Sequence, residues 1–119
     1  MQQVHLGRYD FTRFTHLGHR RLFNSFREIN SGPVCGPASA LNWSIKYFFR
    51  TFFKASFAQF FFEWISTFLY FWLKYFDFFL IKKQGAYDSA SGYFFYGIKE
   101  EFVISDREII KEYKGLIDA

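Results

Sequence analysis

The chain has 119 residues, which is enough for one small domain and no more. Half of the residues are hydrophobic and 26% are aromatic, with 20 phenylalanines, and this composition excludes a disordered chain. The formal net charge is +4, but no long run of lysine or arginine occurs, so we expect no nucleic-acid partner.

The apolar content also exceeds what so short a chain can bury. We therefore expect a partner surface, which would be a missing part of the domain, a second copy of the chain, or a membrane surface. A single cysteine, Cys35, excludes an internal disulfide. The first ten residues lack the basic and apolar regions of a secretion signal, so we expect a cytoplasmic protein with the option of membrane association.

The segment 4–29 gathers all three histidines of the chain, His5, His16 and His19. Thr15 is expected to be the N-cap of a helix near 15–25, because its side-chain oxygen can accept an unpaired backbone N–H. Leu22 and Phe26 are four residues apart and would share one buried face of that helix, whereas Arg20 and Arg21 would form a solvated face. An extended segment near 26–31 follows, and Ser31-Gly32-Pro33 predicts a turn.

Pro37 is well suited to the first position of a helix near 37–53. Apolar residues recur there at helical spacing: Ala38, Leu41, Ile45, Phe48, Phe49 and Phe52. After a break at 54–57, a second helix is expected near 58–81. Its polar residues form one narrow stripe, which we expect to face water: Gln59, Glu63, Thr67, Tyr70, Lys74 and Asp77.

The rest of that second helix is apolar, so it must be covered on several sides. The window 55–73 holds one charge, Glu63, and is close to membrane-spanning length. The polar stripe argues against a span. Packing in a core or an oligomer, and a helix lying in a membrane interface, both stay open.

Residues 82–91 are polar and predict a loop, and the aromatic segment 92–99 predicts a strand. Ser105 and Glu108 form a capping box that opens a helix near 105–114, with Gly115 as its expected end. The fold class is therefore α+β, with about four helices and two strands.

Four groups of residues together resemble a known family: Phe14-Thr15, Arg20-Arg21-Leu22-Phe23, residues 26–32 and residues 90–97. The first three resemble, in order, the segment that follows the fifth sheet strand in class I S-adenosylmethionine-dependent methyltransferases, the group that includes the type 11 domain, and residues 90–97 resemble the last strand of that family. The resemblance implies that strands 26–31 and 92–99 are the last two of a Rossmann-like sheet, paired antiparallel. The helical pair at about 37–81 would then be an insertion between them.

The glycine-rich loop and the acidic residue with which that family holds its cofactor have no counterpart here. The resemblance therefore implies that residues 1–119 are a single partial domain, the C-terminal portion of such an enzyme, with Met1 internal to the complete protein. The complete family uses S-adenosylmethionine. For this chain alone we expect no cofactor and no cofactor-binding residues, and whether it takes part in an enzyme stays open.

By the same resemblance, the loop and helix start of segment 4–29 would lie at the methyl-acceptor site. His5 and His16 are the candidates for acid–base catalysis, because a histidine in a first helical turn favours the neutral imidazole that can accept a proton. Candidates for substrate binding are Tyr9, Asp10 and Arg13. A local ion pair between Asp10 and Arg13 that orders the loop is the alternative. The small-molecule acceptor is not identified by the sequence.

His16 and His19, one turn apart, could bind a metal together with His5 or Cys35, but zinc sites show other spacings, and we expect no metal. Two functions from different classes remain. The first is the acceptor-side segment of a methyltransferase, inactive alone and in need of an N-terminal half. The second is a non-enzymatic helical protein that self-associates or lies on a membrane surface through its aromatic helices.

Overall fold

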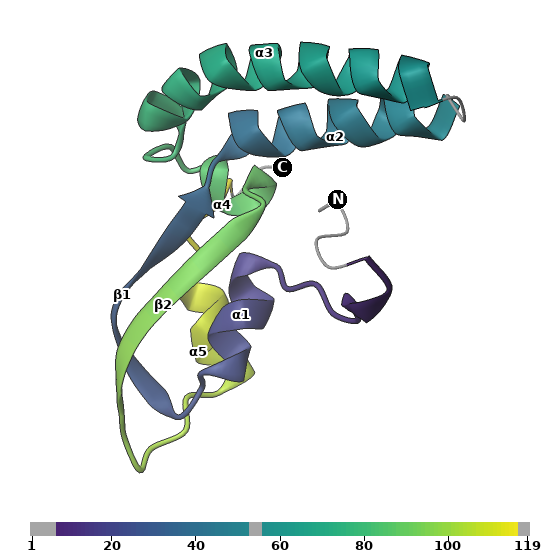
Figure 1. Cartoon of the computed structure of the whole chain (residues 1–119). Coiled ribbons are helices and arrows are strands. Elements are labelled where there is room, and N and C mark those ends of the chain that lie inside the picture. The colour runs from purple at the N-terminus through teal and green to yellow at the C-terminus, as the bar shows by residue number, and fades with distance from the viewer. Residues whose placement is uncertain (1–6, 53–55, 117–119) are drawn as a thin grey trace.

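The computed structural model describes residues 7–52 and 56–116, and it shows an α+β fold (Figure 1). A two-stranded ribbon runs through the molecule, with short helices along one side and a long helical hairpin at one end. In chain order the elements are η1 (Gly7–Tyr9), α1 (His16–Leu22), β1 (Phe26–Cys35), α2 (Pro37–Phe52), α3 (Ser56–Leu80), α4 (Ala86–Ser89), β2 (Gly92–Lys99) and α5 (Asp106–Lys111).

The ribbon pairs β1 with β2 antiparallel, from Phe26 opposite Lys99 to Cys35 opposite Gly92, as predicted. β1 is longer than expected, because it continues through the segment Ser31-Gly32-Pro33, so the predicted turn is wrong. Pro33 lies opposite Tyr93 beside an irregularity in the register. A proline is tolerated at such a position, since among the described residues β1 pairs on one side only and does not need every N–H for pairing.

Helix α1 begins as predicted, because the Thr15 side chain accepts a hydrogen bond of 3.0 Å from the Gly18 N–H. It ends at Leu22, three residues sooner than expected. Phe23 leaves the helix and stacks on Phe95 of β2, with 4.8 Å between ring centroids. The predicted shared face of Leu22 and Phe26 is wrong, since Leu22 is 57% exposed and Phe26 belongs to β1.

The capping box at Ser105 and Glu108 is present and opens α5, which packs beside α1. The helix ends at Lys111, so Gly115 does not end it. The predicted loop 82–91 contains one helical turn, α4, and the described residues therefore form five α-helices instead of about four.

Helices α2 and α3 lie side by side and antiparallel (Figure 1). Near the end of α3, the Asp77 carboxylate accepts hydrogen bonds from the Ala38 N–H (2.8 Å), the Ser39 N–H (2.9 Å) and the Ser39 hydroxyl (2.5 Å). It thereby caps the first turn of α2 from another helix. A Cβ on Gly36 would lie 2.4 Å from Asp77 Oδ1, so only glycine allows this approach.

The polar stripe of α3 faces water only in part, which corrects the prediction. Asp77 is 8% exposed and faces α2. Glu63 is about half buried and lies 3.7 Å from Lys46 Nζ and 3.6 Å from an Arg50 guanidinium nitrogen, both on α2. Thr67 and Lys74 are exposed. The stripe therefore runs along one edge of the contact between the two helices.

The buried core is small. Among the described residues the buried hydrophobic side chains are Ala38, Ala86, Ala90 and Ile109, and no large side chain is fully buried. The radius of gyration is 17.0 Å, against about 13.5 Å for a compact domain of this length. The accessible surface is 9165 Å², against about 6,800 Å² for a compact protein of this mass. The chain is thus more open than a self-contained domain.

Within residues 7–52 and 56–116, none of the helices combines the length and the apolar character needed to cross a membrane.

Candidate functional site

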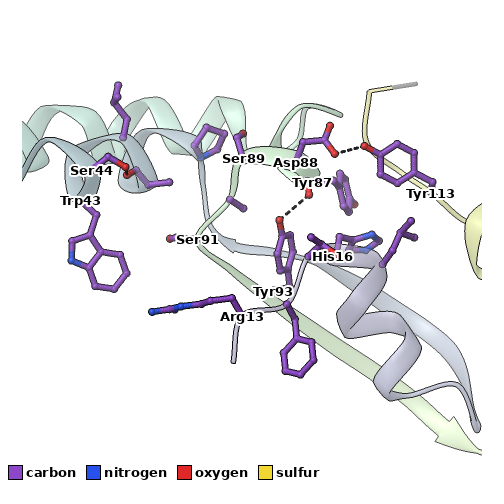
Figure 2. A pocket seen from close by; sticks show the side chains of 17 residues that line it. Arg13, His16, Trp43, Ser44, Tyr87, Asp88, Ser89, Ser91, Tyr93 and Tyr113 are labelled. Carbon is purple, nitrogen blue, oxygen red and sulfur yellow. Dashed lines mark hydrogen bonds between the residues drawn. The ribbon is translucent and has the colours of Figure 1, made fainter. Parts of the chain in front are cut away.

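A pocket of about 860 Å³ lies where the ribbon, the start of α1, the first turns of α2 and α4 come together (Figure 2). Its volume falls within the usual range for small-molecule sites. The wall is mostly aromatic and aliphatic, with a few polar side chains. The residues that line it are Arg13, Phe14, Thr15, His16, Leu17, Pro37, Ala40, Leu41, Trp43, Ser44, Tyr87, Asp88, Ser89, Ala90, Ser91, Tyr93 and Tyr113.

His16, the first residue of α1, is the most enclosed titratable group of this wall, with 5% of its surface exposed. The Tyr87 and Tyr93 rings contact the imidazole edge-on, with centroid distances of 4.9 Å and 5.7 Å. Its Nε2 lies 3.5 Å from Ser31 Oγ, which is a long contact. Within the described part of the chain its Nδ1 has no hydrogen-bond partner.

The pKa of His16 is lowered from its ordinary value. Burial is the main cause, because it disfavours the charged imidazolium, and the positive charge of Lys114 adds to the effect. The nearby Glu28 carboxylate offsets part of this lowering. His16 is therefore a neutral imidazole near pH 7.

Beside His16 lies a cluster of polar side chains, formed by Glu28 and Ser31 of β1 and by Lys114, which follows α5. Lys114 Nζ donates to Glu28 (2.6 Å) and to Ser31 Oγ (3.1 Å), and the Ser31 hydroxyl donates to Glu28 (2.8 Å). Burial alone would raise the pKa of Glu28. The hydrogen bonds from Lys114 and Ser31, and the charges of Lys114 and Arg20, outweigh it and lower that pKa.

Arg20 joins this cluster and corrects the sequence interpretation, which placed it on a solvated face. It is 4% exposed and pairs with Glu112 at 3.0 Å and with Glu28 at 3.4 Å. Its guanidinium also lies over the Phe95 ring. Arg21 is exposed, as expected. Arg20 thereby connects α1, β1 and the end of α5 below the pocket.

Tyrosines and an aspartate form another part of the pocket wall (Figure 2). The Tyr93 hydroxyl donates to the Tyr87 carbonyl (2.8 Å), and the Tyr113 hydroxyl donates to Asp88. The pKa of Tyr93 is raised by burial and by the Asp88 charge, and that of Tyr113 is raised by its hydrogen bond to Asp88. A Cβ on Gly115 would overlap both Asp88 and the Tyr113 hydroxyl, so this glycine allows a close approach.

Of the residues predicted from the sequence, Arg13 and His16 both line the pocket. Asp10 does not line it but pairs with Arg13, which is the local ion pair considered as the alternative. Tyr9 is 63% exposed and accepts a hydrogen bond from Arg8, away from the pocket wall. His5 lies outside the described residues.

The sequence interpretation missed several residues of this wall, above all Tyr87, Asp88, Tyr93 and Tyr113. Tyr93 was assigned only to a strand, and 87–88 only to a loop. The one sequence signal for a helical turn at this part of the wall is Gly85, which directly precedes α4, but the polar composition of 82–91 favoured a loop. Trp43 was also missed as a pocket residue, because the amphipathic pattern of α2 assigned it only to a helix.

His16 and His19 do not converge. His19 contacts the Phe23 ring edge-on, while His16 lies between two tyrosines. In residues 7–52 and 56–116, no three histidine, cysteine, aspartate or glutamate side chains lie close enough to hold a metal ion. Cys35 is exposed at the end of β1.

The site thus combines a neutral buried imidazole, one guanidinium and an aromatic wall around a cavity of ligand size. Such an arrangement can hold a small organic molecule and accept a proton from it. No protein-family model, curated protein or solved structure matches the chain.

Proposed function

We propose that the chain is the acceptor-side, C-terminal portion of an S-adenosylmethionine-dependent methyltransferase, and that the pocket holds the methyl acceptor. One observation carries the proposal: Arg13 and His16, two of the residues that the sequence resemblance directs to the acceptor, line the same pocket. They reach it from the loop before α1 and from the first turn of α1.

His16 would act as the base that takes the proton from the hydroxyl or amine that receives the methyl group. Methyl transfer to such a group leaves one proton to be removed, and a neutral imidazole accepts it. The lowered pKa of His16 supports this role, since the imidazole is unprotonated near pH 7. Arg13 lines the same wall with its guanidinium paired to Asp10, so its positive charge is already compensated and His16 alone carries the chemical role in this proposal.

The sheet supports the proposal in a second way. A ribbon of two strands is marginally stable alone, and β1 and β2 pair only with each other in the described residues. Their exposed side chains include Ile29, Val34, Phe94, Tyr96 and Ile98. Further strands could pair with the edge of such a ribbon, and this is what the proposal requires of the last two strands of a Rossmann-like sheet.

The residues present do not fit the cofactor itself. No glycine-rich run occurs in the sequence, and such a run lets backbone N–H groups approach the ligand. The cofactor site therefore falls to another half, encoded in the same reading frame or supplied by a separate chain. Only the acceptor side is assigned to this chain.

The test is to express the chain together with the segment encoded upstream of it, and to compare it with the chain alone. We expect the longer protein to bind S-adenosylmethionine and to methylate a small hydroxyl or amine acceptor. His16→Gln in that protein should lower kcat by about 100-fold, as loss of a general base does, with cofactor affinity unchanged. An upstream segment without a glycine-rich strand–loop–helix, together with an inactive longer protein, would refute the proposal.

A second candidate function is favoured by a different observation. Helix α3 exposes a large number of aromatic side chains along its length, as expected of a non-enzymatic protein that associates through its helices. This function predicts that replacing the exposed aromatic side chains of α3 abolishes association, whereas His16→Gln leaves association unchanged.

A further inference from the structure

The outward face of α3 carries large apolar side chains along the whole helix. They recur at spacings of three and four, and the most exposed include Phe57 (83%), Phe78 (69%), Trp64 (68%) and Phe79 (68%). We call this surface the aromatic face, formed by Phe57, Phe60, Phe61, Trp64, Phe68, Phe71, Trp72, Tyr75, Phe76, Phe78 and Phe79. The face runs from Phe57 to Phe79 on α3, which is about 34 Å at 1.5 Å per residue.

The face contains no charged residue, because the three charges of α3 lie elsewhere on its circumference. The two acids are engaged with α2: Glu63 lies beside Lys46 and Arg50, and Asp77 caps the first turn. Lys74, in contrast, is exposed. Acids are thus directed towards the partner helix and away from the aromatic face.

Cations border the aromatic face. Lys74 Nζ lies over the rings of Phe71 and Tyr75, at 4.8 Å and 5.1 Å from their centroids. Lys82 Nζ lies 5.6 Å from the centroid of Phe78. Long lysine side chains can keep apolar contact through their methylene groups while the ammonium reaches a polar layer.

The whole net charge of the chain also lies in this part of the sequence. Residues 37–83 contain six lysines and arginines against two acids, which gives +4. The remaining residues contain nine basic and nine acidic side chains, so they are balanced. Figure 1 shows α3 at the outer edge of the molecule, with α2 between it and the ribbon.

We propose that the aromatic face of α3 docks on a lipid bilayer that contains anionic phospholipids, with the helix lying in the plane of the interface. A charge-free aromatic face with cations at its border matches such a surface, since rings enter the headgroup boundary and lysines meet the lipid charges. The indole and phenol groups of Trp64, Trp72 and Tyr75 suit that boundary, where one end is apolar and the other is hydrated.

A second copy of the chain fits the face less well. Two copies meeting face to face would bring the bordering cations Lys74 and Lys82 of one copy to the same interface as those of the other, and like charges there repel. An anionic bilayer compensates the same charge. The proposal is independent of the methyltransferase assignment, because it uses none of the pocket residues.

The experiment is flotation of the full chain with vesicles of phosphatidylcholine and phosphatidylglycerol in a 7:3 ratio (roughly the anionic content at which surface potentials attract basic segments), and with pure phosphatidylcholine as reference. We expect binding to the mixed vesicles, weaker binding to the neutral ones, and a blue shift of tryptophan emission on binding. Trp64→Glu combined with Phe68→Glu should lower the partition coefficient by on the order of 100-fold. Lys82→Gln combined with Lys83→Gln should lower it roughly 25-fold on the anionic vesicles.

Phe102→Glu is the matched control. Phe102 is 65% exposed, close to the exposure of Trp64 and Phe68, but it lies outside the hairpin, between β2 and α5. Its replacement should leave flotation unchanged. All these positions are exposed, so circular dichroism should report folded variants. Equal flotation of the Trp64/Phe68 variant and wild type would overturn the proposal. The proposal would also be overturned if the chain formed a discrete dimer that did not bind vesicles and that Trp64→Glu dissociated.

Discussion

Asp77→Ala is expected to destabilise the protein strongly, because it removes the cap that holds α2 to the end of α3. The carboxylate is 8% exposed and accepts three hydrogen bonds, two of them from the backbone N–H groups of Ala38 and Ser39. Loss of an N-cap costs about 1 kcal/mol on average. Leaving the buried Ala38 N–H unpaired adds about 1–3 kcal/mol. We therefore expect the free energy of unfolding to fall by roughly 2–4 kcal/mol.

Urea unfolding followed by circular dichroism at the helical band measures this loss. Asp106→Ala is the matched control, since Asp106 is an exposed acid of α5 whose pair with Arg21 is also exposed. Its removal should change the free energy of unfolding by less than about 0.5 kcal/mol. A loss below that same limit for Asp77→Ala would show that the carboxylate does not hold the hairpin together, and the reasoning would fail.

Gly36→Ala should lower the free energy of unfolding by about as much as Asp77→Ala, because the new Cβ would displace the Asp77 carboxylate. The double variant should lose little more than either single variant, and additive losses in urea unfolding would contradict this. Glu63→Leu should change the free energy of unfolding by a few tenths of a kcal/mol, since its pairs with two α2 cations are about half exposed; a loss above about 2 kcal/mol would place it in an enclosed site. The pKa of His16 is lower in the folded chain than in the unfolded chain, so as the pH falls the unfolded chain binds a proton at this histidine before the folded chain does. The free energy of unfolding should therefore fall as the pH drops below 6.5. His16→Gln should flatten that fall between pH 7.5 and 5.5, and an unchanged slope would exclude His16 as its source.

The parts of the fold that could be predicted depend on residues close together in the sequence. The Thr15 cap and the capping box of Ser105 and Glu108 are both settled within three residues, and both are present. The apolar spacing of 37–53 likewise indicated α2. The antiparallel pairing of β1 and β2 was implied by the resemblance, and the structure has it.

The errors concern contacts between residues far apart in the sequence. Arg20 looked solvated because its partner Glu112 is 92 residues away. Asp77 looked like part of a water-facing stripe because its partners on α2 lie 38 and 39 residues earlier. The pocket wall has the same origin, since His16 contacts Tyr87 and Tyr93, which lie 71 and 77 residues later in the sequence.

Calorimetric titration with S-adenosylmethionine tests the central claim most directly, when the chain alone is compared with the chain joined to its upstream segment. If this chain is the acceptor side of a methyltransferase, the chain alone should give no binding heat, because it lacks the glycine-rich loop. The joined protein should bind the cofactor with micromolar affinity, on the order of −8 kcal/mol. Micromolar binding by the chain alone, or none by the joined protein, would contradict the account.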